Sequence, residues 1–200
     1  DGPEAFLSFL PLAHAYEHTA GQFLPIALGA QIHYAEGLER LGANLADARP
    51  TIMVVVPRLF EVFRGRLLRE AERRGPAARR LLDWTVALGS RSAGRRRPRL
   101  VDRPRFGGRL RAMVSGGAPL NPDVGLFFQA LGLSVLQGYG ETEAGPVISC
   151  NRPAAGIRMD SVGPPLADTE VMIAEDGEIL VGGELVMLGY WGDPDATAAA

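Results

Sequence analysis

The sequence predicts an α/β protein in which a parallel-sheet subdomain with flanking helices is followed by the start of a small antiparallel β subdomain. Apolar strand-like runs alternate with helical periodicity up to about residue 150. The run over residues 51–56 is rich in β-branched residues and lies between Pro50 and Pro57, which is typical of a strand buried on both faces. After residue 162 the predicted strands instead lie on either side of Asp176-Gly177, a dipeptide that favours a hairpin turn.

The first half of the chain is expected to contain four helices and two strands. A helix over residues 16–28 precedes a short strand over residues 31–34, and a helix with regularly spaced leucines then ends at Pro50. Beyond the buried strand, two further helices are separated by Gly75-Pro76. The apolar stripes of the three later helices are Leu38, Leu41 and Leu45; Phe60, Phe63 and Leu67; and Leu81, Trp84, Thr85 and Leu88.

Strand, helix and strand alternate again after an arginine-rich connection. A buried strand over residues 110–114 ends in the small-residue turn 115–119. The next helix begins at Asn121, a suitable N-cap that is followed by Pro122 and Asp123. A third short strand over residues 133–136 runs directly into the glycine-containing segment 137–143.

The C-terminal part is expected to be antiparallel. Residues 170–174 and 178–181 form the arms of a hairpin, and residues 184–187 form another strand after Gly182-Gly183. A boundary is expected near residues 154–161, where proline, glycine and polar residues replace the core pattern. The expected domains are therefore an α/β subdomain over residues 1–155 and an incomplete β subdomain over residues 156–200.

The composition is that of a globular protein, with 46% hydrophobic and 22% charged residues, and it excludes fibrous and disordered classes. No apolar stretch approaches the roughly 20 residues of a membrane-spanning helix. The single cysteine, Cys150, cannot form an internal disulfide, and no signal-peptide pattern is present, so we expect a cytoplasmic protein. Because the chain opens on Asp1 and stops within an alanine-rich segment, we also expect it to be a piece of a longer protein.

Charge is unevenly distributed although the net charge is only −2. Residues 1–48 hold one arginine and six acidic residues, residues 49–111 hold 18 arginines and five acidic residues, and residues 112–200 hold two arginines and twelve acidic residues. The densest part, Arg95–Arg111, could contact an anionic membrane peripherally, and a solvated helix face and loop is the alternative. Phe106 alone is aromatic there, so no specific nucleic-acid partner is expected.

Two small-residue loops leave the carboxyl ends of neighbouring predicted strands, the edge at which ligands bind in open α/β sheets. In the first loop, Gly116, Gly117 and Ala118 leave the main chain open to a flat ring or a phosphate. The second loop combines an aromatic ring, a hydroxyl and two carboxylates, which suit adenine, phosphate and Mg²⁺. These side chains belong to Tyr139, Thr142, Glu141 and Glu143. The glycine spacing matches neither a P-loop nor a dinucleotide-binding fingerprint.

The second loop, Gln137-Gly138-Tyr139-Gly140-Glu141-Thr142-Glu143, resembles the adenine and magnesium motif of the AMP-forming acyl-CoA synthetases, members of the adenylate-forming superfamily. Other segments resemble further motifs of this family in the same order. They are Phe9–His14 for the acyl pocket, Ser115–Leu120 for the adenine edge, Val162–Leu166 for the subdomain entry, and Gly177–Val181 continuing to Val186–Trp191. The segments Pro11–Glu17 and Asn151–Pro153 are most similar to the long-chain fatty-acid branch.

The resemblance implies a long-chain fatty-acid:CoA ligase whose partners are a fatty acid, ATP with Mg²⁺, and CoA. In such enzymes a fatty carboxylate attacks the α-phosphate of ATP, which gives acyl-adenylate and pyrophosphate, and the CoA thiol then displaces AMP. The resemblance implies catalytic roles for Thr142 at the α-phosphate and for Glu143 as the Mg²⁺ ligand. The implied nucleotide-binding residues are Gly116, Gly117, Ala118, Gln137, Gly138, Tyr139, Gly140 and Thr142, and the implied acyl-site residues are His14, Ala15 and His18.

Some parts of such an enzyme have no counterpart in this sequence. All 21 basic residues are arginine, so both catalytic lysines of the family, with the upstream phosphate loop and the downstream lid, would lie outside these residues. We therefore expect the segment alone to bind adenylate weakly and not to turn over. Gly182 stands where relatives commonly carry arginine, and the connection over residues 91–109 is shorter than usual.

Two alternatives to this function stay open from the sequence. One is an enzyme that adenylates aryl, bile or amino acids. The other is a non-catalytic remnant whose arginine-rich segment binds membranes or nucleic acid. For single residues, His14 and Cys150 could be structural, and Tyr139 could merely pack in its turn. A serine hydrolase is not supported, since the Gly-x-Ser-x-Gly elbow is missing.

Overall fold

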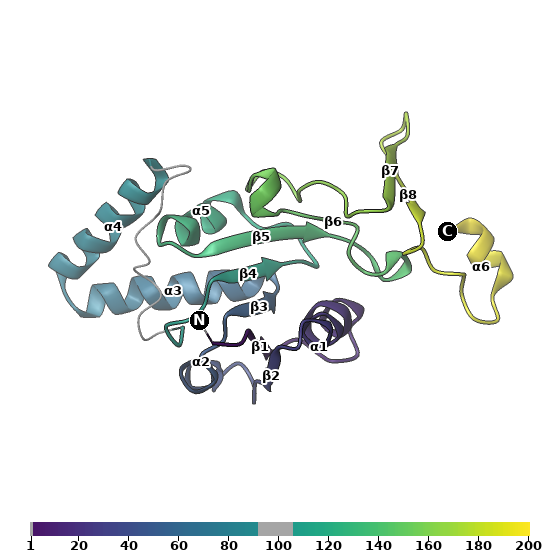
Figure 1. Ribbon diagram of the computed structural model, residues 1–200. Helices are drawn as coiled ribbons and strands as arrows, with labels where there is room; N and C mark the ends of the chain where they lie inside the picture. Colours follow the sequence, from purple (N-terminus) through teal and green to yellow (C-terminus); the bar gives the residue numbers. More distant parts are fainter. Residues whose placement is uncertain (1, 92–105) are drawn as a thin grey trace.

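The structure, a computed structural model, describes residues 2–91 and 106–200 and centres on a six-stranded sheet with the order β2-β1-β3-β4-β5-β6 (Figure 1). Neighbouring strands from β2 to β5 in this order are parallel, and β6 is antiparallel to β5. The predicted α/β class with a parallel sheet is confirmed. The strands are β1 (Ala5–Ser8), β2 (Gln31–Tyr34), β3 (Ile52–Val55), β4 (Ala112–Ser115), β5 (Ser134–Tyr139) and β6 (Ser149–Cys150).

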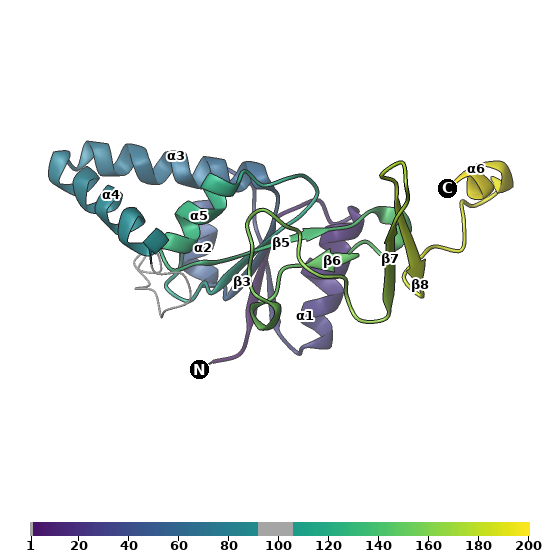
Figure 2. The same cartoon turned by 90° about the horizontal axis from the view of Figure 1, so that it is seen from above.

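Helices lie on both sides of this sheet, with α3 and α5 on one side and α1 on the other (Figure 2). The helix predicted over residues 16–28 begins as a π-helix, η1 (Glu17–Phe23), and continues as α1 (Leu24–Ala27). None of the helices in the two described ranges combines the length and the apolar character that crossing a membrane requires. The other helices are α2 (Leu41–Ala48), α3 (Pro57–Arg73), α4 (Pro76–Arg91), α5 (Pro122–Ala130) and α6 (Pro194–Ala199), with short 3₁₀ turns η2 (Thr142–Ala144) and η3 (Pro153–Ala155).

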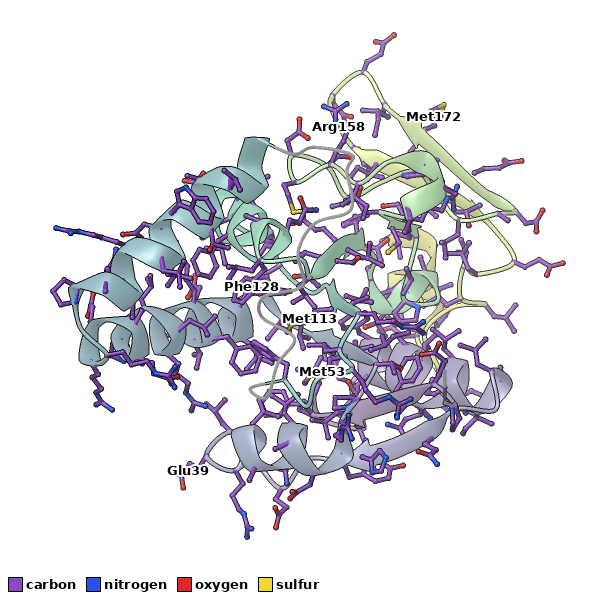
Figure 3. All side chains as sticks on the ribbon, turned by 60° about the vertical axis from the view of Figure 1, so that its left-hand side comes forward. Glu39, Met53, Met113, Phe128, Arg158 and Met172 are labelled. Atoms are coloured by element: carbon purple, nitrogen blue, oxygen red, sulfur yellow. The ribbon has the colours of Figure 1, made fainter. Side chains whose placement is uncertain are left out.

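The main core lies between the sheet and helices α2, α3 and α5. Because successive strand residues point to opposite faces, alternate residues such as Met53 of β3 and Met113 of β4 reach this core, and both are completely buried. Phe128 of α5 is also completely buried, and its ring contacts that of Phe60 edge-on at a centroid distance of 5.5 Å. Figure 3 shows Met53, Met113 and Phe128 in the interior and Met172 at the periphery.

The start of α5 follows its sequence signal closely. Oδ1 of Asn121 accepts a hydrogen bond from the main-chain N–H of Asp123 at 2.9 Å, and Pro122 occupies the first turn. The predicted N-cap is therefore confirmed. This cap fixes where the chain leaves the loop after β4, which is one of the two loops that we expected at the ligand-binding edge.

A separate two-stranded antiparallel sheet, β7 (Thr169–Ile173) with β8 (Ile179–Gly183), stands away from the main sheet (Figure 1). The predicted hairpin is confirmed, but the further strand over residues 184–187 is wrong. Gly183 has a φ of +126° and begins a turn, in which the N–H of Val186 bonds the carbonyl of Gly183 at 3.2 Å. The next N–H, that of Met187, bonds the carbonyl of Glu143, so this segment packs on the main subdomain instead of extending the small sheet.

Three further details differ from the prediction. β5 continues to Tyr139, because β6 supplies a pairing partner that the local pattern does not reveal. Leu38 is 45% exposed and precedes α2. The predicted stripe of α4 is largely solvent-facing, with Leu81 62% and Trp84 59% exposed. Within that stripe Thr85 is only 7% exposed, and Gly89, one turn later, faces α5, where an added Cβ would overlap the backbone of Ala130.

Candidate functional site

The loops after β4 and β5 line one cavity of about 770 Å³, within the range of small-molecule sites. Gly116 and Gly117 come from the first loop, and residues 139–143 come from the second. Apolar side chains of the sheet and of η1–α1 form much of the remaining wall, which makes the cavity polar at the loops and apolar elsewhere. These apolar residues are Phe6, Ala20, Leu24, Leu28, Ile52, Val54, Val114 and Leu136, and Pro146, Val147 and Leu166 add apolar surface from loops beyond β5.

The loop after β4 can have its shape only with glycine at two positions. A Cβ on Gly116 would lie 2.8 Å from the Tyr16 ring, and Gly117 has a φ of +78°, where other residues are strained. Tyr16 is itself fixed, since its hydroxyl donates to the carbonyl of Val114 at 3.1 Å. Burial is the main cause that raises the pKa of Tyr16, so this hydroxyl is a neutral donor. The ring therefore packs against the main chain of the loop.

The loop after β5 reverses tightly at Gly140. A Cβ at this position would overlap the carbonyl of Pro146, and the N–H of Ile148 bonds the carbonyl of Tyr139 at 2.9 Å. This close return holds the half-buried side chain of Tyr139 at the cavity and starts the turn η2, which carries Thr142 and Glu143. Backbone contacts on both sides of the loop thus fix the positions of Tyr139, Thr142 and Glu143.

Glu143 is half-buried and lines the cavity, and two hydrogen bonds hold it from residues further along the chain. Its Oε1 accepts the Tyr190 hydroxyl at 2.8 Å, and its carbonyl accepts the N–H of Met187 at 2.8 Å. The hydrogen bond to Glu143 is the main cause that raises the pKa of Tyr190. Mg²⁺ in proteins is usually bound by one or two carboxylates together with phosphate oxygens and water. The Glu143 carboxylate is therefore a suitable ligand for a nucleotide-bound Mg²⁺. The described residues contain no cluster of three or more metal-binding side chains.

Of the expected acyl-site residues, the structure brings only His14 to the cavity. Nδ1 of His14 accepts the main-chain N–H of Tyr16 at 3.2 Å, which orients the ring while leaving it exposed. His18 points elsewhere and stacks on Phe23, with ring centroids 4.5 Å apart. Neither His18 nor Ala15 lines the cavity, because successive residues of a helix project in different directions.

Two expected nucleotide-binding residues also lie outside the cavity lining. Gln137 is buried on the side of the sheet that α5 covers, where its Oε1 accepts the N–H of Leu120 at 2.8 Å and its Nε2 donates to the carbonyl of Ser161 at 3.2 Å. Ala118 is exposed beyond the rim of the loop. Gly138, Gly140 and the other expected residues of both loops do line the cavity. The two-residue period of β5 explains why Gln137 and Gly138 face opposite sides.

The sequence prediction missed the apolar wall of the cavity. The local patterns place four of its residues in predicted strands without distinguishing the two faces of the sheet: Ile52, Val54, Val114 and Leu136. Successive residues of a strand point to opposite faces, so every second residue faces the core and the others face the cavity. This alternation is the sequence feature that could have identified the cavity wall. Cys150 also lines the cavity, and burial raises the pKa of its thiol, so the thiol form is favoured.

Most of the arginine-rich segment 95–111 lies outside the described residues, which resume at Phe106. The two arginines that are described near its end make local contacts. Arg109 donates to the carbonyl of Pro3 at 2.6 Å, and Arg111 forms an ion pair with Glu4. Both pairs join the end of this segment to the residues just before β1.

Comparison with known proteins identifies the family of this chain. The family model described as AMP-binding enzyme matches residues 2–191. The chain belongs to the AMP-binding enzyme family. This AMP-binding chain is 34% identical over 215 residues to the long-chain-fatty-acid–CoA ligase FadD15 of Mycobacterium bovis, with 98% of the chain and 35% of that protein covered. It therefore spans about a third of the length of this curated relative.

Solved structures share the fold of this AMP-binding chain. A benzoate CoA ligase from Burkholderia xenovorans LB400 superposes with a TM-score of 0.69 at 21% identity, over 100% of the chain and 36% of that protein. An O-succinylbenzoate coenzyme A synthetase from Bacillus subtilis, solved with ATP and magnesium ion, superposes with a TM-score of 0.67 at 20% identity, over 98% of the chain and 36% of that protein.

Proposed function

We propose that this chain is the adenylate-binding part of an AMP-forming long-chain fatty-acid:CoA ligase. The observation that supports the proposal most directly is that both glycine-containing loops open onto one cavity with an apolar remainder. A nucleotide needs the first feature and a hydrocarbon chain needs the second. The 34% identity to a long-chain-fatty-acid–CoA ligase supports the same substrate class.

The nucleotide would bind at the polar end of the cavity. In this proposal Tyr139 stacks on adenine, the open main chain of Gly117 meets the edge of the ring, and Thr142 contacts the α-phosphate. Tyr139, Gly117 and Thr142 all line the cavity, which supports these roles. Their spacing on two neighbouring strand ends also agrees with the usual position of ligands at the carboxyl edge of parallel strands.

The reaction would proceed in two steps. A fatty carboxylate oxygen attacks the α-phosphorus of ATP, the bond to pyrophosphate breaks, and acyl-adenylate forms. The thiolate of CoA then attacks the acyl carbon and AMP leaves with the carboxylate oxygen. Mg²⁺, when bound to Glu143 and the phosphates, would neutralise charge between the two anionic reactants. His14, at the cavity, would contact the acyl substrate.

The remaining features of the whole enzyme are proposals as well. The α/β subdomain would end at residue 155, and residues 156–200 would begin a β subdomain. The parent protein would be cytoplasmic, with peripheral attraction to anionic membranes through segment 95–111. Sedimentation of the full-length protein with anionic vesicles at low salt and its release at high salt would support this attraction, and equal sedimentation with zwitterionic vesicles would contradict it.

The experiment that tests the function is ATP–pyrophosphate exchange by the full-length protein. We expect exchange with long-chain fatty acids and much less with aryl, bile or amino acids. Glu143→Gln should reduce the exchange rate at least tenfold, because a ligand of the Mg²⁺ is lost. Glu175→Gln is the matched control, since Glu175 is an exposed carboxylate at the tip of the distant hairpin.

Two results would contradict the proposal. Full exchange by Glu143→Gln would remove the assigned role of this residue. A preference for aryl or amino acids in the same panel would retain adenylation but replace the fatty-acid assignment. Binding of DNA or vesicles in the absence of any exchange, unchanged in Tyr139→Ala and Glu143→Ala, would instead favour a non-catalytic protein.

A further inference from the structure

The segment over residues 185–190 holds Glu143 from two sides. Its carboxylate Oε1 accepts the hydroxyl of Tyr190, which lies 47 residues later in the chain, at 2.8 Å. Its carbonyl accepts the N–H of Met187, also at 2.8 Å. Leu185 packs against the next turn, where a Cβ on Gly145 would lie 2.9 Å from that of Leu185. The position of this cavity carboxylate therefore depends on a segment outside the main sheet.

Tyr190 is in turn fixed by the start of α6. The N–H of Tyr190 donates to Oγ1 of Thr197 at 2.9 Å, and the Thr197 hydroxyl donates to the carbonyl of Asp193 at 2.7 Å. Oδ1 of Asp193 accepts the N–H of Ala196 at 2.9 Å and so caps the helix. Gly189 permits this approach, since its φ is +139° and an added Cβ would lie 2.5 Å from the Thr197 methyl group. A continuous set of contacts thus runs from α6 to Glu143.

We propose that Tyr190 is a positioning residue for Glu143. Its hydroxyl donates a hydrogen bond to Oε1 of Glu143, which leaves Oε2 to bind a divalent cation in the cavity. The identity of that cation as nucleotide-bound Mg²⁺ rests on the proposed function. Mg²⁺ is usually held by one or two carboxylates together with phosphates and water, so the orientation of a single carboxylate has a large effect on affinity. Hydrogen bonds to the second oxygen of a ligating carboxylate commonly serve this purpose.

The proposal predicts a defect in cation affinity when the hydroxyl is removed. In the full-length protein, Tyr190→Phe keeps the ring and deletes only the donor to Glu143. We expect the Kd of Mn²⁺, measured by electron paramagnetic resonance with ATP present and fatty acid absent, to rise about tenfold. The Mg²⁺ concentration that gives half-maximal pyrophosphate exchange should rise similarly, while saturating Mg²⁺ restores most of the rate.

Two sets of controls separate positioning from general loss of structure. Trp191→Phe alters the adjacent aromatic residue, which is fully exposed, and should leave both cation measurements unchanged. Thr197→Val removes the hydroxyl that fixes the main chain of Tyr190 and should weaken Mn²⁺ binding less than Tyr190→Phe does. Thr197→Ser keeps that hydroxyl and should behave as the unaltered protein.

The outcomes are distinguishable from failure of the proposed function. Unchanged or tighter Mn²⁺ binding by folded Tyr190→Phe would overturn the positioning role, because a competing hydroxyl would weaken cation binding instead of supporting it. A lower rate at saturating Mg²⁺ with unchanged cation affinity would also overturn it. If Glu143→Gln binds Mn²⁺ and exchanges pyrophosphate normally, the error lies in the proposed function itself.

Discussion

Oε1 of Gln137 accepts the main-chain N–H of Leu120 at 2.8 Å and thereby ties β5 to the end of the loop that follows β4. Both groups are buried. The two loops that line the cavity are thus joined behind it, on the side of the sheet away from the cavity. This relationship gives Gln137 a structural function in place of the nucleotide contact that its sequence position suggested.

Replacing Gln137 with alanine should therefore weaken the site without touching the cavity wall. The buried N–H of Leu120 would lose its acceptor, which costs about 1–3 kcal/mol of unfolding free energy. We expect urea unfolding to show this loss together with weaker binding of AMP. Gln31→Ala, at an exposed position of the edge strand, should change the unfolding free energy by no more than about 0.5 kcal/mol. Equal effects of the two substitutions would rule out the bracing role.

A steric prediction concerns Gly116 and Tyr16. Gly116→Ala would place a methyl group 2.8 Å from the Tyr16 ring and should destabilise the protein by about 1–3 kcal/mol through overpacking. In the double variant with Tyr16→Leu, the clash is absent, so the combined loss should be smaller than the sum of the single losses. Denaturant unfolding of the four proteins measures this coupling, and strict additivity would contradict the predicted contact.

Another glycine gives the matched comparison. Gly42 lies within α2, and an added Cβ there would have no atom within 4 Å. Gly42→Ala should raise the unfolding free energy by up to about 1 kcal/mol, because alanine favours a helix more than glycine does. A loss of stability in Gly42→Ala would show that steric contact with neighbouring atoms is not the main determinant of the unfolding free energy of these glycine variants.

Glu17 should make stability depend on pH. This residue is completely buried in η1, where Ser8 donates to its Oε1 at 2.6 Å and its Oε2 has no hydrogen-bond partner among the described residues. Burial is the main cause that raises the pKa of Glu17 above its value in the unfolded chain, and the hydrogen bond from Ser8 opposes it. Between the unfolded and folded pKa values the folded state holds more protons, so stability falls as pH rises.

The corresponding substitution is Glu17→Gln, which removes the charge. We expect a gain of about 1–3 kcal/mol at neutral pH, the usual cost of a buried polar group that is poorly compensated. Near pH 4, at or below the ordinary pKa of glutamate, about 4.3, the gain should shrink towards zero. Urea unfolding across this pH range tests the prediction, with Glu39→Gln on the exposed surface as the control. A gain that is the same at both pH values would argue against titration of Glu17.

The core between sheet and helices should be sensitive to loss of volume at Phe128. Phe128→Ala removes a completely buried ring that packs against Phe60 and should cost about 3–5 kcal/mol. Met172→Ala, at a position 62% exposed on the hairpin, should cost less than about 0.5 kcal/mol. Thermal and denaturant unfolding of both variants provide the measurement. Similar losses would mean that the hairpin is packed far more tightly than its exposure indicates.

The α/β class was predictable from local patterns, because the buried run at residues 51–56 and the helical stripe of Phe60, Phe63 and Leu67 have distinct periods. Local patterns also predicted the start of α5 at Asn121 and the two glycine-containing loops. These features depend on neighbours within a few residues, and such information is present in any short window of the chain.

The face on which each side chain lies, and the contacts between distant segments, depend on tertiary packing. Gln137 faces Leu120 on the α5 side of the sheet, His18 stacks on Phe23 outside the cavity lining, and residues 184–187 form a turn in which Met187 bonds Glu143. The positions of Gln137 and of residues 184–187 depend on partners far away in the sequence, Leu120 for Gln137 and Glu143 for Met187, and a local pattern contains no record of them. Strand pairing and side-chain burial are collective, so they become defined only when the whole sheet and its helices are assembled.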